Sequence, residues 1–142
     1  MIDDLGFLLA KATHRWNELL AERFAATGHS DIRPSYGSVL VPLFEEDGLR
    51  MGELARRAHL SKQTMTELVR RLEGEGLVER RPDPADGRAA LIFLTAPSRD
   101  FEPTATVILD ELDRLVRGQI GEERAAELKA SLTELLDLGR GP

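Results

Sequence analysis

The sequence has 142 residues, enough for one ordinary domain with an apolar core, and its 42% hydrophobic and 31% charged residues are typical of a globular protein. It has no cysteine, which excludes disulfides, thiolate nucleophiles and zinc sites built on sulfur, and its three histidines are too far apart to suggest a metal or cofactor site. The N-terminal apolar run is short for a signal peptide, and no stretch approaches the ~18 apolar residues of a membrane span, so we expect a cytoplasmic protein.

The charge is unevenly distributed along the chain. The formal net charge is −6, yet residues 50–88 contain nine Lys and Arg against seven Asp and Glu, a net +2. The segments 1–49 and 89–142 each sum to −4. One basic segment in an acidic chain is typical of a localised DNA-binding face, although so small an excess can also arise by chance.

The first half of the chain predicts helices. Apolar residues at a spacing near 3.6 predict a helix over 3–27, ended by Gly28, and a second helix from Pro34 to about 47 with a kink at Pro42. A short helix over 52–58 should follow. After a tight turn at 59–60, Ser61 is a good N-cap for a helix that reaches about Glu73.

The period then changes to that of two short strands. Residues 76–81 and 88–94 predict a hairpin, joined by a protruding loop over 82–87 that is dense in turn residues. A helix capped by Thr95 should come next, kinked or restarted at Pro103 and ended near Arg117, before a last helix that carries Leu128–Leu136.

This order of elements predicts a fold that is mainly α with a small β-hairpin, an α+β class. The single domain over 1–142 would hold a winged helix-turn-helix module at 34–95. The flanking helices, over 1–33 and 96–142, are expected to pair two copies into a dimer.

The helix predicted from Ser61 has one buried face and one polar face. Met65, Leu68, Val69 and Leu72 fall within about 100° on a helical wheel. The opposite side carries Gln63, Glu67, Arg70 and Gly74, flanked at its margins by Thr64, Thr66 and Arg71, with Lys62 beside them in the first turn. The hydroxyl, amide and cationic groups among these can meet base edges and phosphates. A lone helix of this kind is usually only amphipathic. The short helix and turn before it favour a DNA-reading helix, as does a first turn without acids.

The predicted hairpin adds a second candidate contact. We expect Arg88 at its tip, where an arginine can enter a narrow minor groove, with Asp86 bracing the guanidinium. Arg80 and Arg81 on the adjoining strand add positive charge. The alternative is an exposed turn whose charges only keep the protein soluble.

Three segments together resemble the MarR family of bacterial transcriptional regulators. They are Gly52-Glu53-Leu54-Ala55, the run LSKQTMTELVRRLE at 60–73, and Gly76-Leu77-Val78-Glu79-Arg80. The segment PDPADGRAALIFLT at 82–95 is similar to that family's Asp-x-Arg wing. The match covers about 49–95, and the helices outside it agree in order and length.

The resemblance implies a regulator of transcription, a repressor relieved by a small molecule, that binds a pseudo-palindromic operator of double-stranded DNA as a homodimer. It implies base contacts from Gln63, Thr64, Thr66 and Arg70, phosphate contacts from Ser61 and Lys62, and minor-groove insertion of Arg88. With Arg80 and Asp86 of the wing, these are the predicted DNA-binding residues.

The resemblance also implies a small phenolic or anionic effector, held between the dimer helices and the winged module. His14, Trp16 and Tyr36 are the residues expected to line its pocket, although an indole on an apolar stripe more often belongs to a core.

Two other classes of function are less favoured. An enzyme would need a nucleophile with its base, a phosphate loop or a close carboxylate pair, and none is evident in the sequence. A winged helix that binds protein should carry an apolar patch where this chain has Gln63, Glu67 and Arg70.

Overall fold

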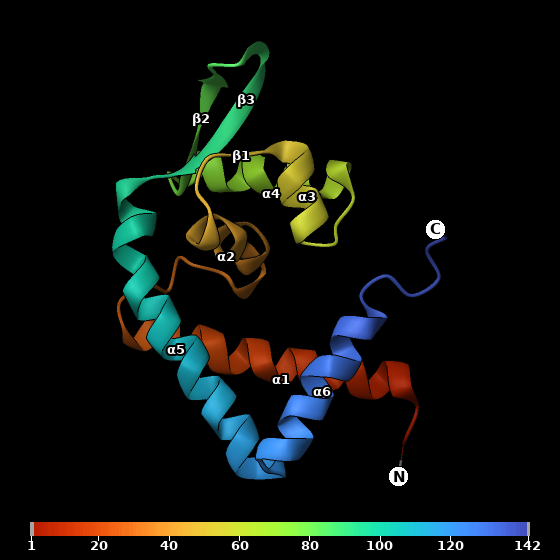
Figure 1. Ribbon diagram of the computed structural model, residues 1–142. Helices are drawn as coiled ribbons and strands as arrows, with labels where there is room; N and C mark the ends of the chain where they lie inside the picture. Colours follow the sequence, from red (N-terminus) through yellow and green to blue (C-terminus); the bar gives the residue numbers. More distant parts are fainter. Residues whose placement is uncertain (1, 142) are drawn as a thin grey trace. The chain divides into compact units, whose positions relative to one another are not determined.

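The computed structural model describes residues 2–141, which divide into two compact units. One unit comprises the residues up to Pro34 together with Thr104–Leu128. The other comprises Ser35–Pro103 together with the residues from Lys129 onward. Figure 1 gives the order of the helices and strands. None of the helices within residues 2–141 combines the length and hydropathy that a membrane-spanning helix needs.

The first unit contains α1 (Leu5–Ala26), most of α5 (Ala96–Ile120) and the start of α6 (Glu122–Leu135). Helix α1 begins where Asp4 accepts a hydrogen bond from the backbone N–H of Phe7 at 2.9 Å. The chain turns away from α1 at Gly28, as expected from the sequence. The buried residues of this unit are Leu20, Phe24, Ile32, Ala105, Ile108, Leu112 and Ala125.

Helix α5 differs from the prediction at two points. It runs unbroken through Pro103, so of the two alternatives that the sequence left open, a kink or a restart, the restart was wrong. The proline removes one backbone hydrogen bond, and the neighbouring residues Phe101 and Ala105 are both buried. The helix also continues beyond Arg117 to Ile120, and the break falls at Gly121, which has φ +90.

The second unit contains the winged helix-turn-helix module. A 3-10 turn, η1 (Pro34–Tyr36), leads into α2 (Gly37–Glu45), which runs unbroken through Pro42, and then into β1 (Leu49–Arg50) and α3 (Met51–Arg57). Helix α4 (Lys62–Gly74) is followed by β2 (Val78–Asp83) and β3 (Asp86–Leu94). Figure 1 shows the hairpin of β2 and β3 projecting from the α3–α4 pair.

The sheet has three antiparallel strands in the order β1-β3-β2, where the sequence predicted only a hairpin. In the added pairing, Leu49 lies opposite Ile92 and Arg50 opposite Leu91. A strand of two residues has no alternation that a sequence pattern could reveal, so it was missed.

The strands of the hairpin are longer, and the loop between them is shorter, than the sequence predicted. Asp83 pairs with Asp86, so the turn consists of Pro84 and Ala85 rather than residues 82–87. Arg88 is therefore the third residue of β3, close to the turn at the far end of the hairpin. The turn is short because Asp83 accepts a hydrogen bond from the N–H of Ala85 at 2.9 Å.

The core of the module contains the buried face predicted for α4. Met65, Val69 and Leu72 are fully buried, while Leu68 is half-buried. They belong to a core that also contains Tyr36, Val39, Leu40, Leu43, Leu54, Leu77, Ile92 and Leu94. Because this face is fixed inward, the opposite face of α4 is fixed outward.

Candidate nucleic-acid interface

The turn between α3 and α4 sets the start of the exposed helix. His59 adopts a left-handed conformation with φ 54, uncommon for a residue other than glycine. Its N–H donates to the carbonyl of Arg56 at 3.2 Å, and the N–H of Leu60 donates to that of Ala55 at 3.0 Å. These two bonds are a Schellman motif, which ends α3 and redirects the chain at once into α4.

The C-terminal segment contacts the same turn. Nδ1 of His59 lies 3.3 Å from Oδ1 of Asp137, and Nη2 of Arg140 donates to the carbonyl of His59 at 3.3 Å. These contacts lie within one compact unit of the fold. They help hold a left-handed residue in place without a glycine.

The first turn of α4 is stabilised by hydroxyl groups. Ser61 accepts a hydrogen bond from the N–H of Thr64 at 3.1 Å and donates its own proton to Oγ1 of Thr64 at 2.9 Å. Thr66 donates to the carbonyl of Lys62 at 2.7 Å. The predicted N-cap is thereby confirmed. The side chains of Lys62 and Gln63 are exposed at this end of the helix.

Five of the arginines in the module are held by carboxylates of the same chain. They pair as Arg50 with Asp83, Arg56 and Arg57 with Glu53, Arg80 with Glu73, and Arg81 with Glu79. The hydrogen bonds from Arg56, and then those from Arg57, lower the pKa of Glu53 to about 2. Each of these cations already has a carboxylate partner within the protein.

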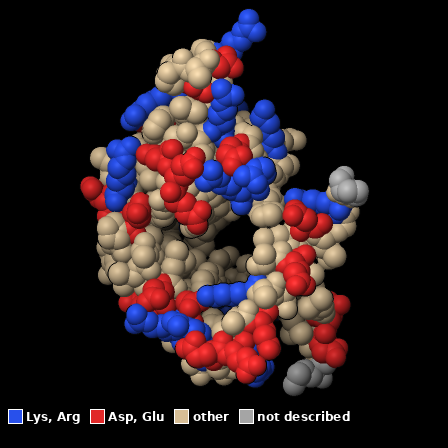
Figure 2. Space-filling view, viewed as in Figure 1, with Lys and Arg blue, Asp and Glu red and all other residues tan. Residues whose placement is uncertain are grey.

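Four cations of the module have no ion pair within the described residues: Lys62, Arg70, Arg71 and Arg88. All four are exposed. Three lie on α4 and one on the wing. Figure 2 shows Lys and Arg side chains over the module and at the far end of the hairpin, interspersed with carboxylates.

The base of the wing is held by one ion pair. Nε and Nη2 of Arg50 lie 2.9 and 2.5 Å from Oδ2 of Asp83 and so tie β1 to the end of β2. The hydrogen bond from the N–H of Ala85, followed by that from Arg50, lowers the pKa of Asp83. Arg81 also lies over the ring of Phe93, 4.3 Å from its centre.

The residues predicted to contact DNA on the wing are arranged differently from the expectation. Asp86 accepts a hydrogen bond from the backbone N–H of Arg88 at 3.1 Å, and no pairing with its guanidinium is present in the described part of the chain. Nε of Arg80 is bonded to Glu73 at 2.8 Å, which ties β2 to α4. Asp86 therefore shapes the backbone, and Arg80 joins the wing to α4.

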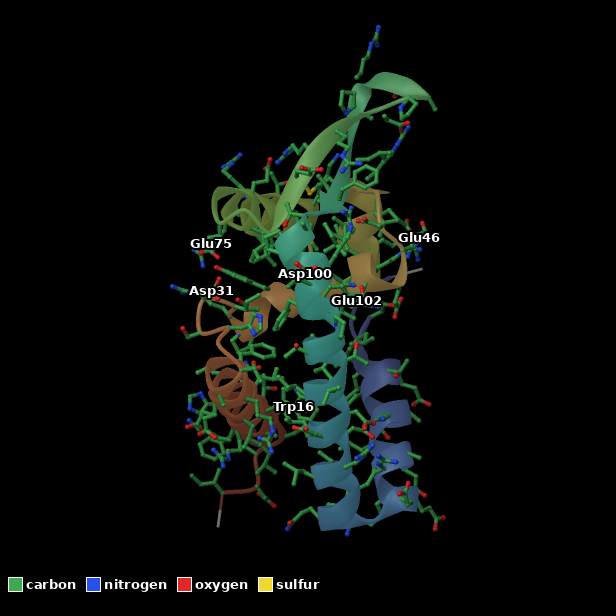
Figure 3. All side chains as sticks on the ribbon, turned by 90° about the vertical axis from the view of Figure 1, so that its left-hand side faces the viewer. Trp16, Asp31, Glu46, Glu75, Asp100 and Glu102 are labelled. Carbon is green, nitrogen blue, oxygen red and sulfur yellow. The ribbon has the colours of Figure 1, made fainter. Side chains whose placement is uncertain are left out.

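The residues predicted to line an effector pocket belong to different units. Tyr36 is fully buried in the module, and its hydroxyl donates to Oε1 of Glu75 at 2.7 Å. Trp16, on α1, is half-buried, and His14 is exposed with Nε2 3.6 Å from Glu18. Figure 3 labels Trp16 and Glu75. The effector site stays a prediction.

Sequence reasoning missed two features of the interface. The clamp of Arg50 on Asp83 depends on the unpredicted strand β1. Arg71 was placed only at the margin of the polar face, and nothing in the sequence alone distinguishes it from the arginines that are paired.

Comparison with known proteins agrees with this geometry. The family model described as MarR family matches residues 33–90. The transcriptional regulator HosA of Escherichia coli O111:H- is 31% identical over 117 residues, which cover 80% of this chain and 87% of HosA. The HTH-type transcriptional repressor Rv2887 of Mycobacterium tuberculosis is 31% identical over 93 residues, 66% of this chain and 67% of that protein.

The fold matches a solved complex. The crystal structure of the Staphylococcus aureus MepR–DNA complex superposes with a TM-score of 0.80 at 26% identity, covering 96% of this chain and 98% of that one. Fold and exposed cations together define a winged-helix, DNA-binding transcriptional regulator rather than an enzyme. The chain belongs to the MarR family.

The Asp83 clamp should make the stability of the wing depend on pH. Replacing Asp83→Asn should lower the Tm by a few degrees at pH 6, because the carboxylate that Arg50 and Ala85 stabilise is removed. A lowered carboxyl pKa gives stability that is fully present above about pH 3.8, the ordinary value, and lost as the pH falls through the lowered pKa. The difference in Tm between the two proteins should therefore shrink below that pH in thermal melts.

The matched control is Asp86→Asn, because Asp86 is exposed and accepts a backbone hydrogen bond from Arg88. It should show a smaller change in Tm. Equal Tm values for wild type and Asp83→Asn at pH 6 would contradict the role given to the clamp.

Proposed function

We propose that this protein is a repressor that acts in the cytoplasm and binds a two-fold symmetric operator of double-stranded DNA as a homodimer. Helix α4 would read base edges in the major groove and the wing would contact the adjacent minor groove. The observation that carries the proposal concerns the nine cations of residues 50–88. Four of them have no ion pair within the described part of the chain, and of these three lie on α4 and the fourth on the wing.

The residues on α4 match the chemistry of groove reading. Gln63 and Arg70 are exposed and can each make a bidentate contact, with adenine and with guanine respectively. Lys62, in the first helical turn, suits a phosphate. Ser61 and Thr66 donate their hydroxyl protons within the protein, to Thr64 and to the carbonyl of Lys62, so each would meet DNA as an acceptor. Thr64 accepts the proton of Ser61, so its own hydroxyl proton remains available as a donor.

Repression and relief by a small molecule rest on family membership. One relative is named a repressor, and the family resemblance implies a phenolic or anionic effector. His14, Trp16 and Tyr36 remain the candidate residues for its pocket. The rival function, docking of a protein on the winged helix, is disfavoured because no large hydrophobic side chain on the described α3, α4, β2 or β3 is exposed.

The terminal helices support the homodimer. Eleven large apolar side chains on or next to these helices are 39–77% exposed in the single chain, an unusual number for surfaces that face water. These are Leu5, Phe7, Leu8 and Leu9 of α1, Val107 and Leu115 of α5, Leu128, Leu132 and Leu135 of α6, and Leu136 and Leu138 after it. A second copy would bury them.

The test of base reading is a randomised-site selection. Wild type should enrich an inverted repeat with half-sites about 10 base pairs apart, centre to centre. Gln63→Ala and Arg70→Ala should each relax one position per half-site and cost about 1–3 kcal/mol of binding, with no change in Tm, because both side chains are exposed.

Arg56→Ala is the matched control, because Arg56 is an exposed arginine of the same module that Glu53 already neutralises. It should keep the wild-type motif. If Gln63→Ala and Arg70→Ala also keep the motif at full strength, α4 is not the reading helix.

The wing is tested by salt dependence. If Arg88 displaces one phosphate counterion in each protomer, Arg88→Ala should reduce the slope of log K against log salt by about 1.8 for the dimer. Arg114→Ala removes the same charge from α5, where Asp110 pairs with it at 2.6 Å, and should leave the slope unchanged. If the slope for Arg88→Ala equals that of wild type, Arg88 of the wing does not contact the DNA backbone.

The dimer is tested with two substitutions at equally exposed positions. Leu9, on α1, and Val41, on α2 of the winged module, are both 40% exposed. Leu9→Glu should weaken dimerisation by about 100-fold or more, because it places a charge in an apolar interface. Val41→Glu should not, as measured by sedimentation velocity at micromolar concentration. A monomeric wild type would defeat the model.

A further inference from the structure

The exposed face of α4 carries one carboxylate among its cations. The helix has two acidic residues, Glu67 and Glu73, and Glu73 is bonded to Arg80. Glu67 is exposed and has no ion pair within the described residues, although Arg70 and Arg71 follow it by three and four positions.

Pairs at such spacings do form elsewhere in this chain. Glu53 pairs with Arg56 three residues on, at 2.6 Å, and Asp110 with Arg114 four residues on, also at 2.6 Å. The carboxylate of Glu67 therefore remains available to an external donor.

Glu67 lies on the stripe that would face the bases. It follows Gln63 by four residues and precedes Arg70 by three, so all three side chains share the face opposite Met65 and Leu72. At 1.5 Å per residue, Glu67 stands about 6 Å from Gln63 and about 4.5 Å from Arg70 along the helix axis. Base pairs are spaced about 3.4 Å apart, so the three side chains can meet successive parts of one half-site.

The chemistry of a carboxylate restricts what it can meet there. Ionised glutamate only accepts hydrogen bonds, and it must enter a groove bordered by phosphates. Guanine and thymine present acceptors to it in the major groove, and adenine presents its N7 acceptor beside the amino group. Cytosine presents its N4 amino group as a donor in the major groove, and it has no acceptor atom beside that group on the same base.

We propose that Glu67 is a specificity-determining residue that selects cytosine at one position of each half-site, between the positions read by Gln63 and Arg70. The inference rests on the proposed function, since it assigns a base to the helix that would read the operator. Burial of Glu67 against any base without an amino donor opposes binding, so the residue acts by rejection as well as by contact.

The experiment is a randomised-site selection with wild type, Glu67→Ala and Glu67→Gln. Wild type should enrich cytosine at one position per half-site. Glu67→Ala should lose the discrimination there, about 5- to 150-fold, and keep the rest of the motif. Glu67→Gln should shift that position towards adenine, because a glutamine amide can bond both N6 and N7.

Glu45→Gln is the matched control, because it removes the same charge from an exposed position of α2, off the reading face. It should leave the motif unchanged. Circular dichroism should give the same melting curve for all variants, since Glu67 has no ion pair to lose.

Two outcomes overturn the inference and are distinguishable. If Glu67→Ala keeps the wild-type motif and binds every sequence more tightly by the same factor, Glu67 is only a repulsive charge, and the proposed function stands. If wild type enriches no inverted motif, the proposed function fails together with this inference.

Discussion

The rotation of α4 about its own axis is the constraint on which the interface depends. Met65, Val69 and Leu72 are fully buried, so any turn of the helix would expose apolar surface and cost about 25 cal/mol per Å². The left-handed turn at His59 fixes where the helix begins. Together the buried face and this turn determine which way the polar face of α4 points and at which residue it begins. The exposed side chains of Gln63 and Arg70 do not contribute to either.

The intramolecular ion pairs then decide which cations remain for DNA. Nine Lys and Arg stand in residues 50–88, but five of the arginines are engaged by carboxylates of this chain. Two of those pairs, Arg50 with Asp83 and Arg80 with Glu73, attach the wing to β1 and to α4. The acidic residues of the module therefore order the scaffold on which the remaining cations are presented.

Much of the interface could be predicted from the sequence because it follows from local rules. The period of 3.6 placed the buried face of α4, and the N-cap at Ser61 is set within one turn. The wing was predicted less well, since its turn depends on a bond from Ala85 to Asp83 and on Arg50 from a two-residue strand. Neither periodicity nor composition records such a contact, so the loop was predicted over 82–87 although the turn consists of two residues.

Pro103 is a second case in which a local signal in the sequence did not predict the structure. A proline in a helix interior predicts a break, because its cost of about 3 kcal/mol is local. Here the neighbouring Phe101 and Ala105 are buried, and burial of apolar surface favours the continuous helix against that local cost. Local signals are therefore dependable in this chain where packing agrees with them and fail where packing opposes them.

The charge balance also bears on how a protein of net charge −6 can bind DNA at all. If each of the four unpaired cations of a module met a phosphate, a dimer would displace at most about eight counterions, with a salt slope no steeper than about −7. The acidic remainder of the chain opposes this attraction at distances within the Debye length, about 8 Å at physiological salt. Non-specific affinity should therefore be low, and discrimination must come from base contacts on the polar face of α4. The carboxylate of Glu67 on that face is consistent with such discrimination, since it lowers the affinity for every DNA sequence except one that supplies a hydrogen-bond donor.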